Sequence, residues 1–459
     1  MPQRHLLTDH PIAIYEAEKQ GLMPVPSALR KDGFWSTFSL FCNSMMNPAT
    51  LISSGLMILA GLPLWLTIFL QVLGSSFSMW PFVVVARIGS RYGIPGQVFC
   101  RAVFGYQGSR WLTSLLRGLT SVYWYAIQTL AAMMAVDAML TNFGITVPLG
   151  WLSVGFVILQ GGVAVIGYGG MSFLSKFTLP LKIAIFALLL LWLVDNGGAQ
   201  ALPESVFRFQ LTQDSWGWPL ALLWLNGLAC GMMSLVTDAA DFSRYTRLSA
   251  RMGFGAVCGV ACGTGIGALF GGWCVIAGGA QSINPFETLI QLQPGILILI
   301  LILVVSVLDA WTINVINLYT GGFSLANAFP KLGRQKATLL VIAAATVLAM
   351  FPEIIHRYVE ILSATGVIYA SISGVLLGWY WRHGRKLDIS ALYEEQGRYW
   401  YWKGWNPAAI CSFITMVVLT HFLSPVWLPS IQALLGAAIL LLLLDRLFFK
   451  KVGRHRVPH

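Results

Sequence analysis

Long apolar runs are the feature that most limits what this chain can fold into. The hydrocarbon core of a bilayer is about 30 Å thick, and a helix needs roughly 20 apolar residues to cross it. By that measure the chain contains about twelve crossing segments. They cover residues 34–60, 64–86, 111–140, 148–168, 176–194, 218–238, 252–279, 295–328, 337–351, 358–381, 405–423 and 428–448. The pattern predicts an all-α polytopic membrane protein.

The composition leads to the same interpretation. Hydrophobic residues make up 57% of the 459 residues and charged residues only 10%, with a mean hydropathy of +0.72. In soluble proteins about a quarter of residues are charged. The net charge of +11 does not indicate nucleic-acid binding, because the basic residues lie in short loops between the apolar runs. The seven cysteines show no metal-ligand spacing, and we expect neither a bound metal nor a disulfide framework.

Lysine and arginine are distributed unevenly between alternate loops. One set of loops holds most of them, and the other set keeps Arg208 and Arg357. Basic loops stay in the cytoplasm, so both termini are expected there, as a tail over 1–33 and a basic tail over 449–459. The first residues lack the apolar core of a signal peptide. We expect a multi-pass protein of the plasma or inner membrane.

One apolar run contains a cluster of polar residues. Asp309, Thr312, Asn314 and Asn317 lie within 295–328 at helical spacing. Polar groups without partners in hydrocarbon cost several kcal/mol each, so such a cluster predicts a functional site. The alternative is that these side chains only join neighbouring helices through hydrogen bonds.

Two basic residues also fall within apolar runs. A carboxyl group such as Asp309 needs a partner or a proton at membrane depth, and Lys182 is the partner we expect. A pair that can exchange a proton suits proton coupling. In the alternative, Lys182 lies near the cytoplasmic face and extends its amine to water. Arg117 has no evident partner, and Asp238 is expected to join the arginines that follow it, Arg244 and Arg247.

Two of the runs are expected to be interrupted helices. Asn43, Asn47 and Pro48 interrupt the first run, and Asn226 and Gly227 interrupt the sixth. A pair of broken helices in corresponding positions of two halves is a sequence pointer to a transporter's binding site. The alternative is a pair of ordinary kinks. The seventh run has a glycine at every fourth position from Gly255 to Gly271, which predicts close helix packing.

Trp124 and Gln128 lie four residues apart, and therefore on one face of a helix. An indole offers a surface on which a flat ring can stack, and a carboxamide offers both a donor and an acceptor for the ring edge. The pair suits a planar nitrogen heterocycle.

Several stretches of the chain resemble the nucleobase:cation symporter-1 family, which includes the cytosine and purine permeases and the hydantoin and allantoin carriers. They are RYGIPGQVFCRAVFGYQGS at 91–109, Trp124 with Gln128, DFSRYTR at 241–247, the asparagine of TIN at Asn314, and YWYWKGWNPAA at 399–409. The resemblance implies a leucine-transporter-like fold, with one five-helix repeat over 34–196 and an inverted repeat over 197–381. A cytoplasmic connector over 382–404 and two additional helices over 405–448 would follow.

The resemblance also implies roles for single residues. Trp124 would stack on the substrate, Gln128 and Asn314 or Asn317 would hydrogen-bond its edges, and Gly231 would lie beside it. Where hydantoin carriers place a second stacking tryptophan, this chain has Met232. Sodium-coupled members have adjacent Ser and Thr hydroxyls where this chain has Thr312 and Ile313, with Asp309 one turn earlier. Because isoleucine cannot bind a cation, we expect proton coupling through Asp309 and Lys182.

The sequence thus predicts a secondary transporter that imports a nucleobase or related heterocycle by proton symport, without a cofactor, with a monomer sufficient for transport. The open alternatives are sodium-coupled uptake of a hydantoin, allantoin or thiamine precursor, and an amino-acid carrier of the same fold. An enzyme is not expected, because the histidines are scattered and no nucleophile and base pair stands out. The GxxxxGK[ST] loop of a primary pump and the repeated filter of a channel are both missing from the sequence.

Overall fold

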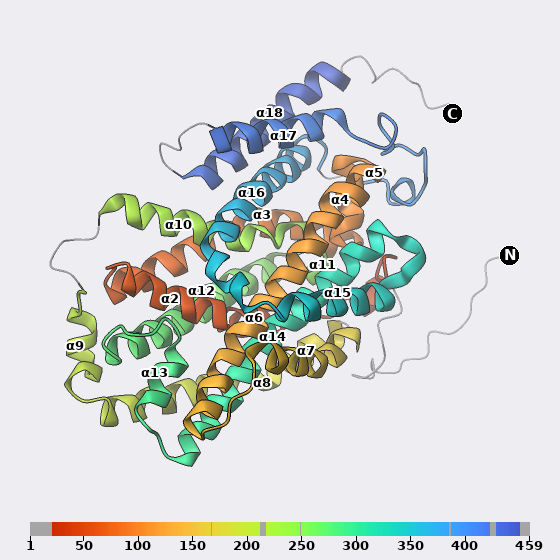
Figure 1. Cartoon of the computed structure of the whole chain (residues 1–459). Helices are drawn as coiled ribbons and strands as arrows, with labels where there is room; N and C mark the ends of the chain where they lie inside the picture. Colours follow the sequence, from red (N-terminus) through yellow and green to blue (C-terminus); the bar gives the residue numbers. More distant parts are fainter. Residues whose placement is uncertain are drawn as a thin grey trace.

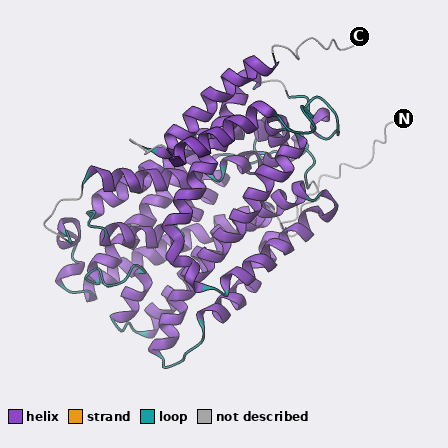
Figure 2. Cartoon of the chain, turned by 45° about the horizontal axis from the view of Figure 1, so that its top comes forward, coloured by secondary structure: helices purple, strands orange, loops and turns teal. Residues whose placement is uncertain are grey.

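The structure is a computed structural model that describes residues 21–166, 168–211, 217–247, 249–384, 387–422 and 428–449. Within these ranges all named elements of secondary structure are helices (Figure 2). Residues 1–20 of the expected N-terminal tail, and the expected basic tail after Phe449, lie outside the described residues.

Twelve crossing segments account for most of the chain, which confirms the predicted count of about twelve. Among the described residues, nine helices are long and apolar enough to cross a membrane, and shorter apolar helices supply the rest. The segments are α1 (Phe34–Met45) with α2 (Pro48–Leu59), α3 (Leu64–Tyr92), α6 (Leu115–Asn142), α7 (Leu149–Ile166), α8 (Tyr168–Asn196), α10 (Trp218–Met233), α12 (Ser249–Ala277), α14 (Ile296–Ala328), α15 (Gly333–Ala349), α16 (Tyr358–His383), α17 (Pro407–Phe422) and α18 (Pro429–Phe449).

Short helices connect the crossing segments on both sides. The side with most of the basic residues, here called the basic side, carries α4 (Gly96–Phe104), α5 (Tyr106–Gly108), the π-helical turn η2 (Ser109–Ser114), η4 (Val236–Asp238), α11 (Ala239–Ser243), η5 (Pro330–Leu332) and η7 (Ser390–Leu392). The opposite side carries η3 (Ala199–Ala201), α9 (Pro203–Arg208), α13 (Pro285–Gln291) and η6 (Pro352–Arg357). The turn η1 (Ser27–Leu29) precedes α1.

The first crossing segment is interrupted between α1 and α2. Asn47 has an extended backbone, and its side chain accepts a hydrogen bond from the Thr50 amide at 3.0 Å, which caps α2. Pro48 occupies the first turn of α2, where its missing N–H removes no helical hydrogen bond. Asn43 does not interrupt the helix as expected, because it lies inside α1 and donates to Ser175 O and Thr178 Oγ1 of α8.

The interruption in the sixth segment lies elsewhere than predicted. Helix α10 runs unbroken through Asn226 and Gly227 and ends at Met233, where the chain passes into the short turn η4. A glycine inside a helix costs only about 1 kcal/mol, which packing can offset. Asn226 uses its carboxamide to hold another helix, since Asn226 Oδ1 accepts from Ser430 N at 2.9 Å and Ser430 Oγ at 2.6 Å.

The glycines of α12 confirm the predicted close packing. A methyl group added at Gly259 would lie 2.6 Å from the carbonyl oxygen of Phe38, and one at Gly263 would collide with the carbonyl oxygen of Cys42. These distances leave no room for a side chain, so the backbones of α1 and α12 lie in direct contact. Helices α17 and α18 pack beside α16 at one edge of the molecule, away from α7 and α8 (Figure 1).

Helix α14 separates its two kinds of residue between lipid and protein. Ile296 and Leu297, at the start of the helix, are each 66% exposed. Asp309 and Asn314 are fully buried, and all the polar residues of the cluster face neighbouring helices.

Candidate functional site

A cavity of about 110 Å³ lies where the two interrupted segments meet α3, α6, α14 and α16. This volume exceeds many times the space that one buried water needs. Its walls mix apolar and polar side chains with backbone. The lining includes Met45, Asn47, Ala49, Thr50, Ser53, Gln71, Ser75, Trp124, Gln128, Gly227, Gly231, Met232, Leu235, Ile313, Asn317, Tyr358 and Leu362.

Trp124 forms one wall of this cavity. Its ring meets Tyr358 of α16 edge to face, with centroids 6.0 Å apart and planes at 82°. The Tyr358 hydroxyl lies 3.2 Å from Ser53 Oγ of α2, so the aromatic wall is tied to the first interrupted segment. Gly231 and Met232 line the cavity from α10. A thioether at position 232 packs against a ligand without offering a flat stacking surface.

Gln128 also lines the cavity, but both ends of its carboxamide already have partners. Gln128 Oε1 accepts from the Ala49 amide, and Gln128 Nε2 donates to Asn47 Oδ1, each at 3.1 Å. Gln128 thereby holds the first turn of α2 against α6. The carboxamide gives the cavity wall its shape in addition to any contact with a bound molecule.

The two asparagines of α14 differ in position. Asn317 lines the cavity, whereas Asn314 lies behind it and is fully buried. Asn314 Nδ2 donates to Gln160 Oε1 of α7 at 2.8 Å and to Thr129 Oγ1 of α6 at 3.0 Å. Asn317 Nδ2 lies 3.4 Å from Asn314 Oδ1.

Lys182 and Asp309 form a fully buried ion pair, with Nζ 2.8 Å from Asp309 Oδ1. Lys182 Nζ also donates to the carbonyl oxygens of Asn43 at 3.0 Å and Met46 at 2.6 Å, and to Thr312 Oγ1 at 3.3 Å. The amine therefore joins α8, α14 and the broken end of α1. Lys182 is buried in the protein and does not extend to a membrane surface.

A second buried ion pair lies between the cavity and the basic side. Arg117 of α6 pairs with Asp238 of η4, and Arg117 Nη2 donates to Thr320 Oγ1 of α14 at 2.7 Å. Both partners are fully buried. This corrects the expectation that Asp238 joins the arginines that follow it. Arg117 had no evident partner in the sequence, and the structure shows that Arg117 compensates the charge of Asp238.

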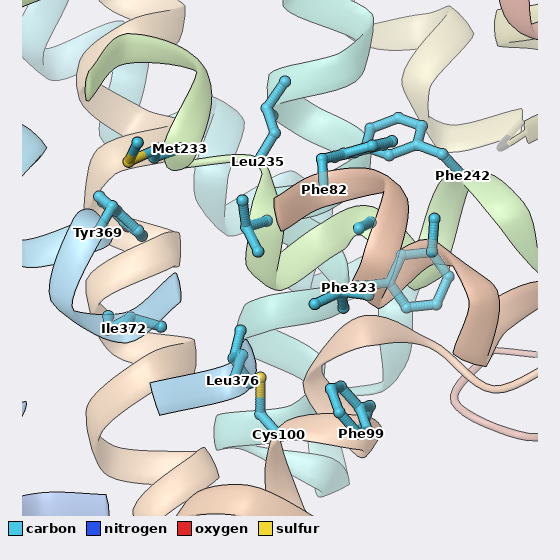
Figure 3. Close-up of a cluster of buried hydrophobic side chains, with 14 of the residues drawn as sticks. Phe82, Phe99, Cys100, Met233, Leu235, Phe242, Phe323, Tyr369, Ile372 and Leu376 are labelled. Carbon is cyan, nitrogen blue, oxygen red and sulfur yellow. The ribbon is translucent and has the colours of Figure 1, made fainter. Parts of the chain in front are cut away.

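An apolar cluster extends from the cavity into the core of the molecule. Leu235 belongs to the cluster and also lines the cavity. Figure 3 shows Phe82, Phe242 and Phe323 near Leu235, with Tyr369 close to Met233 on the other side. Phe99 and Cys100 of α4 continue the cluster away from the cavity.

Sequence reasoning missed several polar residues at this site. Gln71 of α3 lines the cavity and donates through Nε2 to Ser54 Oγ at 2.7 Å. Ser53 and Tyr358 form the contact beside Trp124, and Gln160 holds Asn314. The available signal was a lone glutamine inside an apolar run, at Gln71 and at Gln160. Tyr358 gave no signal, because an aromatic residue at the end of a crossing segment is common.

Comparison with known proteins gives a consistent result. The profile of the family described as permeases for cytosine/purines, uracil, thiamine and allantoin matches residues 24–443. The allantoin permease of Bacillus subtilis is 23% identical over 453 residues, covering 90% of this chain and 88% of that protein. The cytosine permease of Escherichia coli K12 is 26% identical over 449 residues, covering 93% and 94%.

Solved structures show the same fold. A closed structure of Mhp1, a nucleobase-cation-symport-1 family transporter with bromovinylhydantoin bound, superimposes with a TM-score of 0.81 at 19% identity, over 95% of this chain and 96% of that one. A sodium-coupled sialic acid symporter superimposes with a TM-score of 0.67 at 13% identity, over 92% and 91%. The chain is a multi-pass transporter and not an enzyme, and it belongs to the nucleobase:cation symporter-1 family, the permeases for cytosine/purines, uracil, thiamine and allantoin.

Proposed function

We propose that this permease imports a nucleobase or a closely related nitrogen heterocycle by proton symport, and that the Lys182–Asp309 pair carries the proton. The substrate lies in the cavity against Trp124. The observation that carries the proposal is the position of the Lys182 amine, which has four oxygen atoms within 3.3 Å.

The cavity wall supports a flat, polar ring as substrate. Trp124 supplies an aromatic face, and Asn317 supplies a carboxamide among the lining residues. No lysine, arginine, aspartate or glutamate is among the residues that line the cavity, within the described part of the chain. A zwitterionic amino acid would lack a charged partner there, which favours a neutral ring over the amino-acid alternative.

The oxygen atoms around Lys182 support a proton as the coupling ion. Two backbone carbonyls, a hydroxyl and a carboxylate are ligands that a hard cation such as sodium prefers. Here the lysine amine lies among these oxygens, where it would compete with sodium. Asp309 Oδ2 is buried and has no hydrogen-bond partner among the described residues, so a proton can be held on this carboxyl group.

The contacts of the amine also suggest how proton binding affects the helices. When Lys182 is charged, it holds the carbonyls of Asn43 and Met46 and so keeps the end of α1 near α8 and α14. After the pair loses a proton, these contacts weaken and α1 becomes free to shift against α8 and α14. Such a shift is the elementary step of alternating access in this proposal.

Uptake into liposomes tests the coupling. Purified protein is reconstituted, and radiolabelled cytosine, uracil, adenine, hypoxanthine, allantoin and hydantoin are offered with pH and sodium gradients imposed independently. We expect accumulation of at least one compound with an inward proton gradient and no sodium. Accumulation that follows the sodium gradient and ignores pH would overturn the proton assignment, and uptake of none of these compounds would overturn the substrate class.

Replacing the aromatic wall tests the site. Trp124→Ala removes the stacking surface, and we expect at least a tenfold loss of substrate affinity, which is about 1.4 kcal/mol. The measurement is uptake at matched amounts of protein in the membrane. Trp151→Ala is the control, because Trp151 is 63% exposed at the start of α7 and lies away from the cavity. Equal affinity in the Trp124 variant and the control would refute the stacking role.

A further inference from the structure

Three carboxamides form a connected series from α7 to the cavity. Gln160 Oε1 accepts from Asn314 Nδ2 at 2.8 Å, and Asn314 Oδ1 accepts from Asn317 Nδ2 at 3.4 Å. Gln160 and Asn314 are fully buried, and Asn317 is 4% exposed and lines the cavity. We call these residues the amide relay.

The polarity of the amide relay is set by three acceptors around Asn314 Nδ2, of which Gln160 Oε1 is the nearest at 2.8 Å and the backbone of α6 the farthest. Asn314 Nδ2 lies 3.3 Å from the carbonyl oxygen of Tyr125. A carbonyl oxygen only accepts hydrogen bonds, so the Asn314 group that faces it must be the NH2 group. Asn314 Oδ1 then points the other way, toward Asn317.

The same argument fixes Asn317. Asn314 Oδ1 only accepts, so Asn317 must turn its own NH2 group toward it. The remaining group of Asn317 is Oδ1, which accepts no hydrogen bond that the described part of the chain donates and is not among the fully enclosed unpaired oxygens. Because Asn317 lines the cavity, this oxygen is available to a molecule there.

From this geometry, we propose that Gln160 and Asn314 are positioning residues that hold Asn317 with its acceptor oxygen toward the substrate. The inference depends on the proposed function, because it concerns the same cavity. A freely rotating carboxamide can present either its oxygen or its NH2 group to a ligand, whereas one fixed in this way presents its oxygen. The permease therefore selects a ring with an N–H or NH2 donor at this edge, and a ring with an acceptor there leaves two oxygen or nitrogen acceptors unpaired.

Gln160 acts through its oxygen alone. Its Nε2 is buried and has no hydrogen-bond partner among the described residues. A variant that keeps an oxygen at this place should therefore preserve the relay, and a variant without one should release it. Gln160→Glu keeps an oxygen, and Gln160→Met has similar length without an acceptor.

Pairs of bases with one outline and opposite polarity test the inference. Cytosine and uracil exchange donor and acceptor at ring nitrogen 3 and at the group on carbon 4, and adenine and hypoxanthine do so at nitrogen 1 and carbon 6. The measurement is the KM for uptake of each base into liposomes. We expect the wild type to discriminate at least tenfold within a transported pair, Gln160→Met to reduce that ratio to within threefold of one, and Gln160→Glu to keep it.

Ser153→Ala is the matched control. Ser153 is a buried polar residue of the same helix α7, but its hydroxyl donates to Leu149 O and does not contact the amide relay. A merely structural role of Gln160 would lower uptake of both bases of a pair together and leave their ratio unchanged. That result would overturn the inference.

A second variant covers the case that Gln160→Met does not fold. Thr129→Val removes another acceptor of Asn314 Nδ2 with little change in volume, and we expect the ratio to fall about threefold. An unchanged ratio in Thr129→Val would also overturn the inference. The proposed function fails separately, when the wild type takes up no member of either pair and neither allantoin nor hydantoin. A wild type that transports both members of a pair equally refutes the amide relay alone.

Discussion

The protein contains two buried ion pairs with different cations, one with a lysine and one with an arginine. Lys182–Asp309 joins α8, α14 and the broken end of α1, whereas Arg117–Asp238 joins α6 and the turn η4 that follows α10. All four residues are fully buried. Each pair thus links an interrupted segment to a continuous helix.

The chemistry of the cation assigns the pairs different work. An arginine guanidinium stays protonated throughout the pH range of a cell, whereas a buried lysine amine can give up its proton. Arg117 also donates to the Thr320 hydroxyl, while Lys182 holds backbone carbonyls at the helix break. Burial alone therefore does not distinguish the two pairs, and the proposed proton coupling depends on the ability of both partners in the Lys182–Asp309 pair to become neutral.

The largest effect is expected from removing the fixed cation. Arg117→Met leaves Asp238 charged and unpaired, which costs about 3–5 kcal/mol, and we expect a clear fall in the melting temperature of the purified protein. The double variant Arg117→Met with Asp238→Leu should recover most of the lost melting temperature. The control is Arg208→Met, because Arg208 and its partner Glu204 have side chains that are 79% and 74% exposed, and the variant should lose less than about 1 kcal/mol. An equal fall in melting temperature in the single and double variants would show that the unpaired Asp238 charge is not the cause of the loss.

Neutralising the two aspartates should separate the pairs by function. Asp309→Asn leaves a lysine that can shed its proton, so we expect a folded protein that exchanges substrate but loses at least tenfold in accumulation. Asp238→Asn leaves Arg117 buried without a counter-charge, and an arginine cannot shed its proton. We therefore expect a poor yield of folded protein. Asp195→Asn, at an exposed position of α8, serves as control. Full accumulation by Asp309→Asn would exclude Asp309 as the proton carrier.

Fixing the charge at position 182 should remove the response to pH. One pH unit is worth about 1.4 kcal/mol, which supports about tenfold accumulation for one proton per substrate. We expect uptake by the wild type to rise when the outside is made more acidic, and uptake by Lys182→Arg to be flat. Lys176→Arg, at an exposed position of the same helix, should behave as the wild type. A pH response retained by Lys182→Arg would contradict the assignment.

The smallest effects are expected at the hydroxyl partners. Thr320 Oγ1 lies 2.7 Å from Arg117 Nη2, and its loss in Thr320→Val should cost about 1.5 kcal/mol of stability. Thr312 Oγ1 lies 3.3 Å from Lys182 Nζ, so Thr312→Val should cost about 0.5 kcal/mol. Thermal unfolding of both variants measures the difference in stability loss. A larger loss in Thr312→Val than in Thr320→Val would show that the donor–acceptor distance does not determine the strength of these contacts.

The fold was largely predictable, because each crossing segment can be recognised in the sequence as a run of about twenty apolar residues. The first interruption was predictable too, since Asn47 and Pro48 combine a cap with a residue that cannot continue a helix. The second was misplaced, because Asn226 and Gly227 only weaken a helix, and the turn after Met233 carries no comparable signal.

The site divides in the same way. The pairing of Lys182 with Asp309 follows from the cost of burying either charge alone, so sequence reasoning could reach it. The pairing of Arg117 with Asp238 could not be reached, because Asp238 stands at the end of a run and looked like a loop residue. The amide relay depends on which helices are neighbours in space, which no local pattern states.

The glycine contacts between α12 and α1 have a mechanical consequence. Carbonyl oxygens of α1 lie directly against the glycines of α12, with no side chain between the two backbones. We expect any displacement that pulls α1 away from Lys182 to move α12 with it. In the proposed mechanism, the loss of a proton from the Lys182 amine would then allow two helices to move together, one of them 29 residues long.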